Sequence, residues 1–360
     1  VYNHTGDDSI YFNKYQRYPE LGAYQSRASK YYRWYKFINW PNQYACWWGF
    51  KTLPAVNQQD PYYQQFITGK HGVLDKWLTQ GAKGVRLDVI DELDNTFLDK
   101  IYAAVKANDP ENIVIGEVWE DASTKHAYNQ RRRYLWGKQV DSVMNYPLKK
   151  AIIDFIKHDN LTGLVIQIRH LINNYPKHVI DSLMNHLGTH DTVRLLTNFA
   201  PVSPDQLRKE EQAYYHMSEA EYHEAVRRLK MATAIQFTLP GVPSIFYGDE
   251  TGMEGFRDPF CRRTIDWDHI NQDLFNWYQK LGKIRHLSVF VDGQYYEEST
   301  SNNVFAFSRK KDHEKILTIV NNNHYDISYH LGEGFDLIDE LAVSKKVNVP
   351  KKTAKIIKLN

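Results

Sequence analysis

The sequence has few cysteines, no long apolar run and no excess of charge of one sign. Its 360 residues include two cysteines, Cys46 and Cys261, too few for a disulfide framework and arranged in no zinc-binding motif. No stretch approaches the length of a transmembrane helix. Lys and Arg number 45 against 43 Asp and Glu, a net charge of +2, and the densest basic run, residues 131–133, is interpreted as a solvated helix face. We therefore predict no nucleic-acid partner and no membrane partner.

Aromatic side chains are abundant instead. The chain contains 25 Tyr and 9 Trp, and 42% of its residues are hydrophobic. That content over 360 residues is enough for one large domain and a small one. Most aromatic rings in any protein belong to the core, but sugar rings also present apolar CH faces to them.

Three segments each end a buried apolar run with an acidic residue, namely 84–89 (GVRLDV), 113–118 (IVIGEV) and 184–191 (MNHLGTHD). Asp88 and Glu117 are one strand and helix unit apart, at roughly the 30-residue length of such a unit, and Asp191 lies about two units further on. Right-handed crossovers place the carboxyl ends of neighbouring parallel strands at one edge of the sheet. We expect the three carboxylates to converge there, where two acids with a third as support can break a glycosidic bond.

Each of these acids also has a purely structural interpretation. Arg86 and Asp88 leave the same face of a strand, so Arg86 either aims an ionised nucleophile or forms a buried structural salt bridge with it. Glu117 follows an apolar strand, in surroundings that suit a general acid, or it is an ordinary acid at a helix start. His190 and Asp191 either hold sugar hydroxyls, or one packs in the core and the other caps the next helix.

The same alternation of strand and helix extends along most of the chain. We expect strands ending at 1–4, 84–89, 113–118, 140–146, 184–188 and 242–247, with helices near 147–157, 162–174 and 219–238 and helical patterns from Pro61 to Gly81 and over 97–105. From about residue 290 the pattern changes to short strands without helices, at 304–308, 315–321, 327–331 and 354–359.

These patterns predict an α/β fold, a (β/α)8 TIM barrel. The count gives six barrel strands where a closed barrel has eight, so we expect the first two βα units to be absent. Residues 1–4 and 61–289 would form the partial TIM-barrel catalytic domain. Residues 5–60 form an inserted small domain after strand 3, because the stretch is too long for an ordinary loop, and residues 290–360 form a C-terminal antiparallel, β-sandwich-like domain.

Four segments resemble, in order, the four signature regions of the α-amylase family, glycoside hydrolase family 13. They are VYNH at 1–4, GVRLD at 84–88, GEVW at 116–119 and NHLGTHD at 185–191, with supporting stretches at 47–54, 241–250 and 258–263. The resemblance covers nearly the whole chain. It is closest to the branch of neopullulanases, cyclomaltodextrinases and maltogenic amylases.

The resemblance implies a role for each site residue. Asp88 would be the nucleophile, Glu117 the general acid and base, and Asp191 the carboxylate that holds the hydroxyls of the distorted sugar. Two displacements imply retention at the anomeric carbon, with the Asp88 and Glu117 carboxyls about 5 to 5.5 Å apart. The remaining substrate-binding residues are Arg86, His190 and His4 around the reacting glucose, Trp119 stacking on the leaving side, and Asp258 and Arg262 on the non-reducing side.

The chain also departs from the family pattern. The Asp that starts the first signature region, and the stacking residue upstream of it, have no counterpart before Asn3. Asn3 matches a calcium ligand of some relatives, but its upstream partners are lacking, so we predict no metal and no other cofactor. Members of this branch often carry an N-terminal β-domain that builds a homodimer, which is the state expected of the full-length protein.

The leading hypothesis is therefore a retaining α-glucan hydrolase that acts on α-1,4 bonds, and on α-1,6 bonds as a second linkage, in maltodextrins, cyclodextrins or pullulan. A transglycosylase would use the same residues but shield the intermediate from water. A third reading is a catalytically incompetent, glucan-binding fragment of such an enzyme. Product analysis with maltotriose separates the first two, and an activity assay with Asp88→Asn as control separates both from the third.

Overall fold

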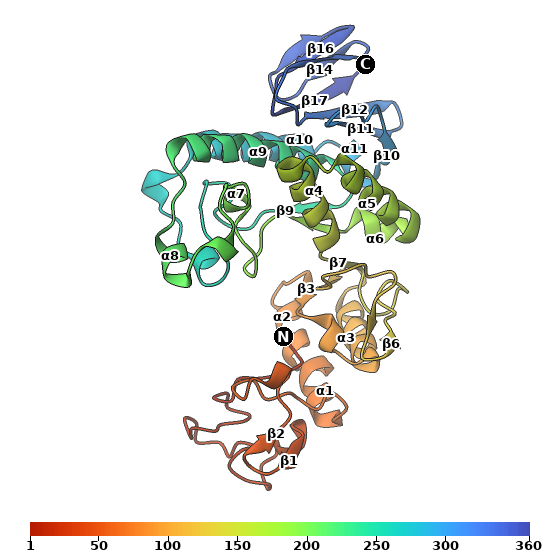
Figure 1. Cartoon of the computed structure of the whole chain (residues 1–360). Helices are drawn as coiled ribbons and strands as arrows, with labels where there is room; N and C mark the ends of the chain where they lie inside the picture. Colours follow the sequence, from red (N-terminus) through yellow and green to blue (C-terminus); the bar gives the residue numbers. More distant parts are fainter. The chain divides into compact units, whose positions relative to one another are not determined.

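The structure is a computed structural model that describes all 360 residues, Val1–Asn360 (Figure 1). The chain divides into two compact units, Val1–Met144 and Asn145–Asn360. This division does not test the three domains predicted from the sequence, whose bounds stay a prediction. No helix combines the length and the apolar composition needed to cross a membrane.

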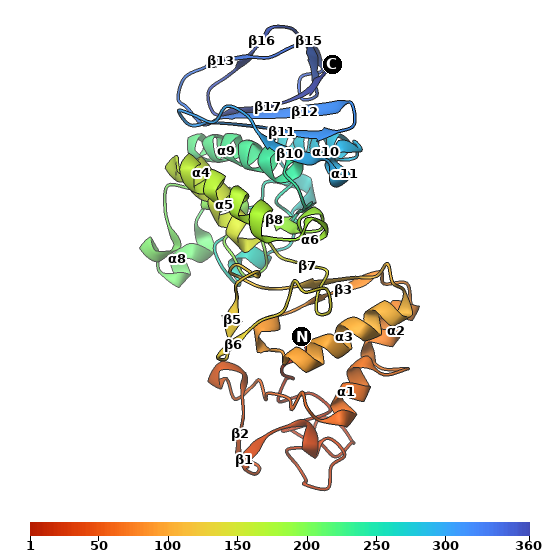
Figure 2. The same ribbon diagram turned by 90° about the vertical axis from the view of Figure 1, so that its right-hand side faces the viewer.

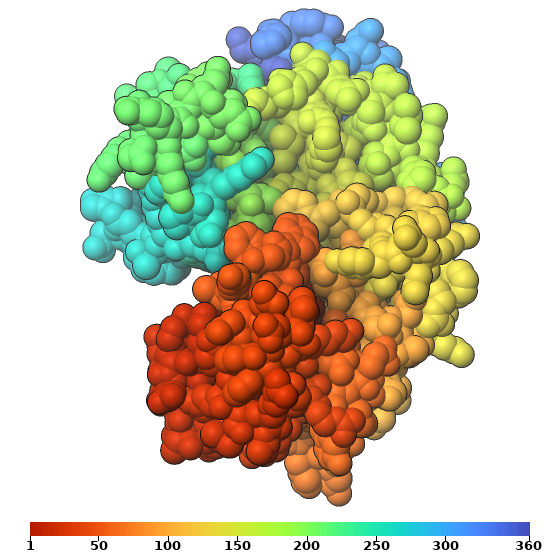
Figure 3. All heavy atoms as spheres, turned by 60° about the horizontal axis from the view of Figure 1, so that its bottom comes forward, coloured from red at the N-terminus to blue at the C-terminus, as the bar shows by residue number.

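The first 60 residues of the first unit contain little regular structure and pack around aromatic rings. Their elements are η1 (Tyr32–Trp34), β1 (Phe37–Asn39), β2 (Gln43–Tyr44) and η2 (Trp47–Gly49), with β1 and β2 antiparallel. Phe12 is fully buried, and its ring lies 4.8 to 6.0 Å from those of Tyr24, Tyr35, Phe37 and Tyr44. This segment forms the red mass in the space-filling view of Figure 3. Aromatic contacts thus take the place of a sheet or a helix bundle as its core.

The expected strand at 1–4 is wrong, because those residues make only one isolated antiparallel bridge, between His4 and Ala55. The helical pattern after Pro61 is two helices rather than one, α1 (Pro61–Thr68) and α2 (Val73–Thr79). Gly69 ends the first in an extended conformation and Gly72 precedes the second. Two glycines within four residues remove the side chains that would favour continuing the helix.

A parallel sheet forms the centre of the first unit. Its strands are β3 (Gly84–Leu87), β4 (Ile113–Gly116) and β7 (Ser142–Val143), joined by η3 (Ile90–Glu92), α3 (Asn95–Asn108), β5 (His126–Ala127) and β6 (Gln130–Arg131). β4 lies between β3 and β7. α3 buries the stripe Phe97, Leu98, Ile101 and Val105, as its periodicity predicts.

The basic run at 131–133 is not a helix face. Arg131 ends β6, and Arg132 is only 4% exposed, with Nη2 donating to the carbonyls of Ile90 and Leu93. Arg133 pairs with Asp99 at 2.9 Å. The interpretation as a solvated face is therefore wrong, because Arg132 is buried and donates to carbonyls of η3 and of the residue after it.

The second unit begins with helices around a two-stranded parallel sheet, β8 (Met184–His186) with β9 (Val242–Ser244). The helices are α4 (Tyr146–His158), α5 (Leu161–Asn174), α6 (Lys177–Asp181), α7 (Leu195–Asn198), η4 (Pro204–Gln206), α8 (Lys209–Tyr214), α9 (Glu219–Thr238), η5 (Phe260–Arg262), η6 (Trp267–His269), α10 (Gln272–Arg285) and α11 (Val289–Asp292). The three helices predicted here are confirmed as α4, α5 and α9. A capping box between Ser218 and Glu221 fixes the start of α9.

The last part of the second unit confirms the predicted antiparallel β-domain. A six-stranded sheet has the order β10 (Gln294–Glu297), β11 (Val304–Lys311), β12 (Glu314–Asn321), β17 (Thr353–Leu359), β14 (Gly334–Asp336) and β15 (Leu341–Val343), and β13 (Ile327–His330) pairs with β16 (Lys346–Val349). α9 lies along β12 and β17 (Figure 2). Arg309 of β11, 1% exposed, donates to the carbonyls of Gly293 and Thr238, which joins the sheet to the end of α9.

Candidate active site

Strand register places Asp88 beside Glu117. β3 and β4 run parallel with Leu87 opposite Gly116, so the two acids follow paired residues at the same end of the sheet. The backbone continues the pairing past the strands, since the Glu117 N–H donates to the Leu87 carbonyl at 2.9 Å. The predicted meeting of these two carboxylates is therefore a direct result of the register.

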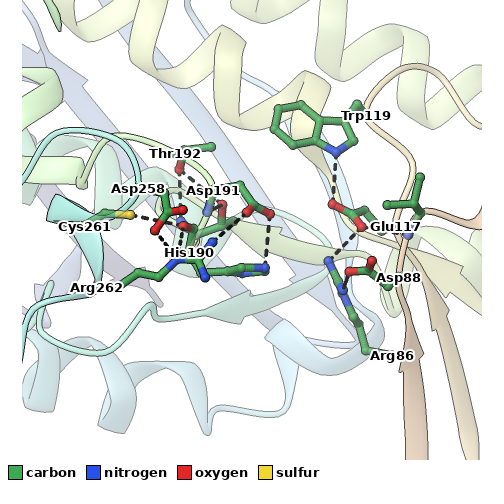
Figure 4. A network of polar contacts seen from close by, with 12 residues as sticks. Arg86, Asp88, Glu117, Trp119, His190, Asp191, Thr192, Asp258, Cys261 and Arg262 are labelled. Atoms are coloured by element: carbon green, nitrogen blue, oxygen red, sulfur yellow. Dashed lines mark hydrogen bonds and ion pairs between the residues drawn. The ribbon is translucent and has the colours of Figure 1, made fainter. Parts of the chain in front are cut away.

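One arginine contacts both carboxylates (Figure 4). Arg86 Nη1 donates to Asp88 Oδ1, and Arg86 Nη2 lies 3.0 Å from Glu117 Oε2. The Arg86 and Asp88 side chains are 29% and 22% exposed, so their contact is not the buried salt bridge of the structural interpretation. A planar guanidinium with several fixed donors can hold two carboxylates in one geometry.

Glu117 lies among polar donors, which the apolar strand before it does not indicate. Its side chain is 3% exposed. In addition to Arg86, the Val89 N–H donates to Oε2 at 2.8 Å and the Trp119 indole N–H to Oε1 at 3.0 Å. No helix starts at Glu117 either, because the next α-helix is α4. Two N–H donors and the contact with Arg86 thus fix the direction of the Glu117 side chain.

Two features of this half of the site have no signal in the sequence. Val89 adopts a left-handed conformation with φ of 39°, which is rare for a β-branched residue and aims its N–H at Glu117. Trp119 is a predicted site residue, but the hydrogen bond from its indole N–H to Glu117 was not predicted, and its ring stays 47% exposed. A left-handed valine cannot be inferred from a single sequence, because the conformation follows from its surroundings.

His4 is placed by a ring stack rather than by a strand. Its imidazole lies over Trp47, with ring centroids 5.1 Å apart and planes 18° apart. Burial lowers the pKa of His4, while the charge of Asp88 acts in the opposite direction. At neutral pH the ring is therefore mostly neutral, and its buried Nδ1 has no hydrogen-bond partner in the protein.

The remaining predicted residues form a second cluster, in the unit Asn145–Asn360. Asp191 Oδ1 accepts from Arg262 Nη2 at 3.3 Å, and Asp191 Oδ2 lies 3.1 Å from His190 Nε2. Arg262 Nε also lies 3.0 Å from Asp258 Oδ1 and donates to the His190 carbonyl at 3.0 Å. Figure 4 shows Arg262 between the two aspartates. The arrangement is a network of exposed polar groups suited to sugar hydroxyls.

The alternative roles given to His190 and Asp191 do not hold. β8 ends at His186, so both residues lie in the loop that follows the strand. The next helix, α7, has Arg194 at its N-cap, and Asp191 therefore caps no helix. His190 is 44% exposed rather than packed in the core.

A buried ion pair between Arg194 and Asp249 follows the loop that carries His190 and Asp191. Arg194 is fully buried, and its Nη1 donates to the Tyr247 carbonyl at 2.6 Å and lies 3.4 Å from Asp249 Oδ1. Burial raises the pKa of Asp249 to about 7. Asp249 lies in the supporting stretch 241–250, whereas Arg194 lies in no segment that the sequence analysis singled out.

The structure thus brings Asp88, Glu117, Arg86, His4 and Trp119 together in one unit and His190, Asp191, Asp258 and Arg262 together in the other. The convergence of Asp191 on Asp88 and Glu117 stays a prediction. No group of three or more His, Cys, Asp or Glu side chains is arranged to hold a metal ion, and Asn3 is buried with an unpartnered amide. The expected absence of a metal and of other cofactors stays a prediction, and no step is assigned to a metal.

The amino-acid sequence of the chain matches a family model and several known relatives. A family model described as the alpha amylase catalytic domain matches residues 1–315. An amylopullulanase of Thermoanaerobacterium saccharolyticum is 33% identical over 342 residues, covering 86% of this chain and 25% of the relative. A cyclomaltodextrinase of Thermoanaerobacter pseudethanolicus is 31% identical over 336 residues, covering 90% of this chain and 51% of the relative. The chain thus spans between a quarter and a half of these relatives.

Solved structures show the same fold. The type III pullulan hydrolase of Thermococcus kodakarensis has a TM-score of 0.81 at 25% identity, covering 100% of this chain and 59% of that one. The cyclic alpha-maltosyl-(1→6)-maltose hydrolase of Arthrobacter globiformis has a TM-score of 0.80 at 22% identity, covering 99% and 74%. The predicted TIM-barrel fold class is confirmed by these matches.

Proposed function

Because the chain belongs to the α-amylase family of glycoside hydrolases, we propose that it is a retaining α-glucan hydrolase. It cleaves the α-1,4 glucosidic bonds of maltodextrins, cyclodextrins or pullulan, with α-1,6 bonds as a second linkage. Relatives named amylopullulanase, cyclomaltodextrinase and neopullulanase support this substrate class. The observation that carries the proposal is the pair of carboxylates, Asp88 and Glu117, held by one arginine at the ends of two parallel strands.

The reaction proceeds by two displacements. Asp88 attacks the anomeric carbon while Glu117 protonates the glycosidic oxygen, so the C–O bond breaks, the leaving sugar departs as an alcohol and a β-glycosyl ester forms on Asp88. Glu117, now ionised, takes a proton from water. The resulting attack on the same carbon releases Asp88 and restores the α configuration.

The neighbouring groups support these steps. Arg86 donates a hydrogen bond to the Asp88 carboxylate and directs it, as a nucleophile requires. The exposed ring of Trp119, anchored to Glu117 by its N–H, stacks on the leaving-side sugar. Asp191 and His190 hold hydroxyls of the reacting sugar, with Arg262 directing Asp191.

Two finer features of the architecture belong to the same proposal. Residues 5–60 form a small domain inserted after the third barrel strand, a division supported by their own aromatic core around Phe12. Residues 290–360 form a separate domain, supported by their own apolar cluster of Ala306, Leu317, Ile319, Val347, Val349 and Ile357. Each segment buries its own apolar side chains, as an independent domain does.

The experiment is an activity and stereochemistry assay on the 360-residue chain. Proton NMR of the fresh products of maltotriose hydrolysis follows the anomeric configuration, and we expect the α anomer first. Asp88→Asn should abolish turnover. Asp8→Asn, a change in an aspartate half exposed at the surface, serves as control and should leave it intact.

Initial formation of the β anomer, or full activity of Asp88→Asn, would contradict the mechanism. Products longer than maltotriose would identify the transglycosylase alternative. Binding of maltotriose without any turnover by the wild-type chain would identify the glucan-binding alternative.

A further inference from the structure

Two exposed aromatic side chains of the unit Val1–Met144 share one carboxylate. Trp48 and Tyr128 are 71% and 67% exposed. The Trp48 indole N–H donates to Glu92 Oε1 at 3.1 Å, and the Tyr128 hydroxyl lies 2.6 and 2.7 Å from the two oxygens of Glu92. Exposed rings of this size normally move among rotamers, whereas hydrogen bonds from both rings to one anchor fix their directions.

The backbone at both rings is also unusual. Trp48 and Tyr128 have φ of 47° and 53°, and Asn129 next to Tyr128 has φ of 59°. Non-glycine residues seldom adopt this left-handed region, and they keep it only where the surrounding structure holds them there. Large apolar rings held towards solvent in a costly backbone conformation indicate a binding role rather than a folding role.

The rings continue a row that starts beside the catalytic carboxylates. His4, which feels the charge of Asp88, stacks on Trp47 at 5.1 Å, and Trp47 stacks on Trp48 at 5.0 Å with planes 19° apart. The anchor Glu92 is the last residue of η3, four residues after Asp88. The row is therefore connected to the reaction centre both through ring contacts and through the chain.

A polar cavity adjoins the far end of this row. It has a volume of about 330 Å³, and Glu92 and Tyr128 lie in its wall. Other wall residues offer amide and carboxylate groups, namely Asn57, Gln58, Gln59, Asp91, Asp94 and Gln130. Aromatic faces next to several hydrogen-bonding groups suit a sugar ring, which has apolar CH faces and hydroxyl edges.

We propose that Trp48 and Tyr128, clamped by Glu92, form an aromatic platform that binds glucosyl residues of an α-glucan beyond those held at Asp88 and Glu117. The inference rests on the proposed α-glucan substrate and adds a binding site to it. Glu92 is a positioning residue here, since it acts through the two rings. The platform favours long oligosaccharides, because short ones are fully held at the carboxylates.

Binding in an inactive background tests the platform. Titration calorimetry of the 360-residue Asp88→Asn chain with maltose, maltotriose and maltoheptaose measures affinity without hydrolysis. We expect Trp48→Ala and Tyr128→Ala each to weaken maltoheptaose binding about three- to tenfold and to leave maltose binding unchanged. Controls are Trp77→Ala and Tyr62→Ala, which remove rings 57% and 66% exposed on α2 and α1, and these should change neither affinity.

The anchor is tested by kinetics as a function of chain length. Glu92→Ala should raise KM for maltoheptaose with little change in kcat, whereas Glu92→Gln keeps an acceptor for both rings and should restore most of the affinity. Trp48→Phe keeps a ring and a folded loop if the alanine variant misfolds, and should lie between wild type and Trp48→Ala.

The outcomes separate the platform from the proposed function. Equal losses for maltose and maltoheptaose, or no loss for either ring variant, overturn the platform. Length-dependent binding by a wild-type chain that hydrolyses nothing keeps the platform and overturns the hydrolase. Absence of binding for every oligosaccharide overturns both.

Discussion

Arg86 gives the sharpest test of the site, because one side chain contacts both carboxylates. Arg86→Ala removes the donor to Asp88 and the ion pair with Glu117 at 3.0 Å. The two acids then lie next to each other with no cation between them. We expect both the stability of the fold and the rate of the reaction to fall, by different amounts.

The size of each effect follows from the geometry. At the observed 3.0 Å the Arg86–Glu117 attraction is about 5.5 kcal/mol for an effective dielectric constant of about 20 and about 1.4 kcal/mol in bulk water. Arg86 is 29% exposed, so much of this attraction is offset by solvation that the free arginine would regain. We expect the free energy of unfolding to fall by about 2 kcal/mol. Without Arg86 the Asp88 carboxylate is no longer held in one direction, and this should lower kcat/KM about 100-fold or more.

Urea unfolding and kcat/KM on maltotriose measure the two effects, and two variants act as controls. Arg86→Lys keeps the charge but not the planar fork, so it should recover more of the stability than of the rate. Arg17→Ala removes an exposed arginine from its 2.8 Å pair with Asp8 and should change neither quantity appreciably. A kcat/KM of Arg86→Ala within fivefold of wild type would refute the assignment of Arg86 as the residue that holds both acids.

Three further predictions concern the second unit. The pKa of Asp249 is raised to about 7 in the fold, above its value in the unfolded chain, so protonation of Asp249 favours the folded state. This contribution to the free energy of unfolding is complete below pH ~4 and is lost as the pH rises through 7. Urea unfolding should show wild type losing about 2–3 kcal/mol more than Asp249→Asn between pH 5 and 8, and parallel curves would contradict this. Arg309→Met leaves the Gly293 and Thr238 carbonyls without their donor and should cost about 2–4 kcal/mol by the same method; a loss under about 0.5 kcal/mol would show the contacts to be dispensable. Arg262→Ala frees Asp191 and should raise KM for maltotriose about tenfold, and an unchanged KM would remove Arg262 from the site.

The secondary structure of the second unit was largely predictable. α9 covers the residues expected from its helical pattern, and β12 and β17 match the expected alternation to within one residue. These elements bury one face against a neighbour over many residues, so their apolar residues recur at regular spacing in the sequence. The predictions of a strand at 1–4 and of a single helix after Pro61 were wrong, because short segments rich in turns and glycine have no regular apolar spacing.

The sequence by itself determined the three acids, their order and the family to which they belong, because strand ends and motif spacing are local properties of the chain. Only the tertiary structure decided how the acids are held. The register of β3 and β4 puts Glu117 within reach of Arg86, and the left-handed Val89 adds a backbone donor to the same carboxylate. The clamp of Trp48 and Tyr128 on Glu92 joins three segments far apart in sequence. Such contacts depend on the relative positions of distant segments, which packing sets and local pattern does not encode.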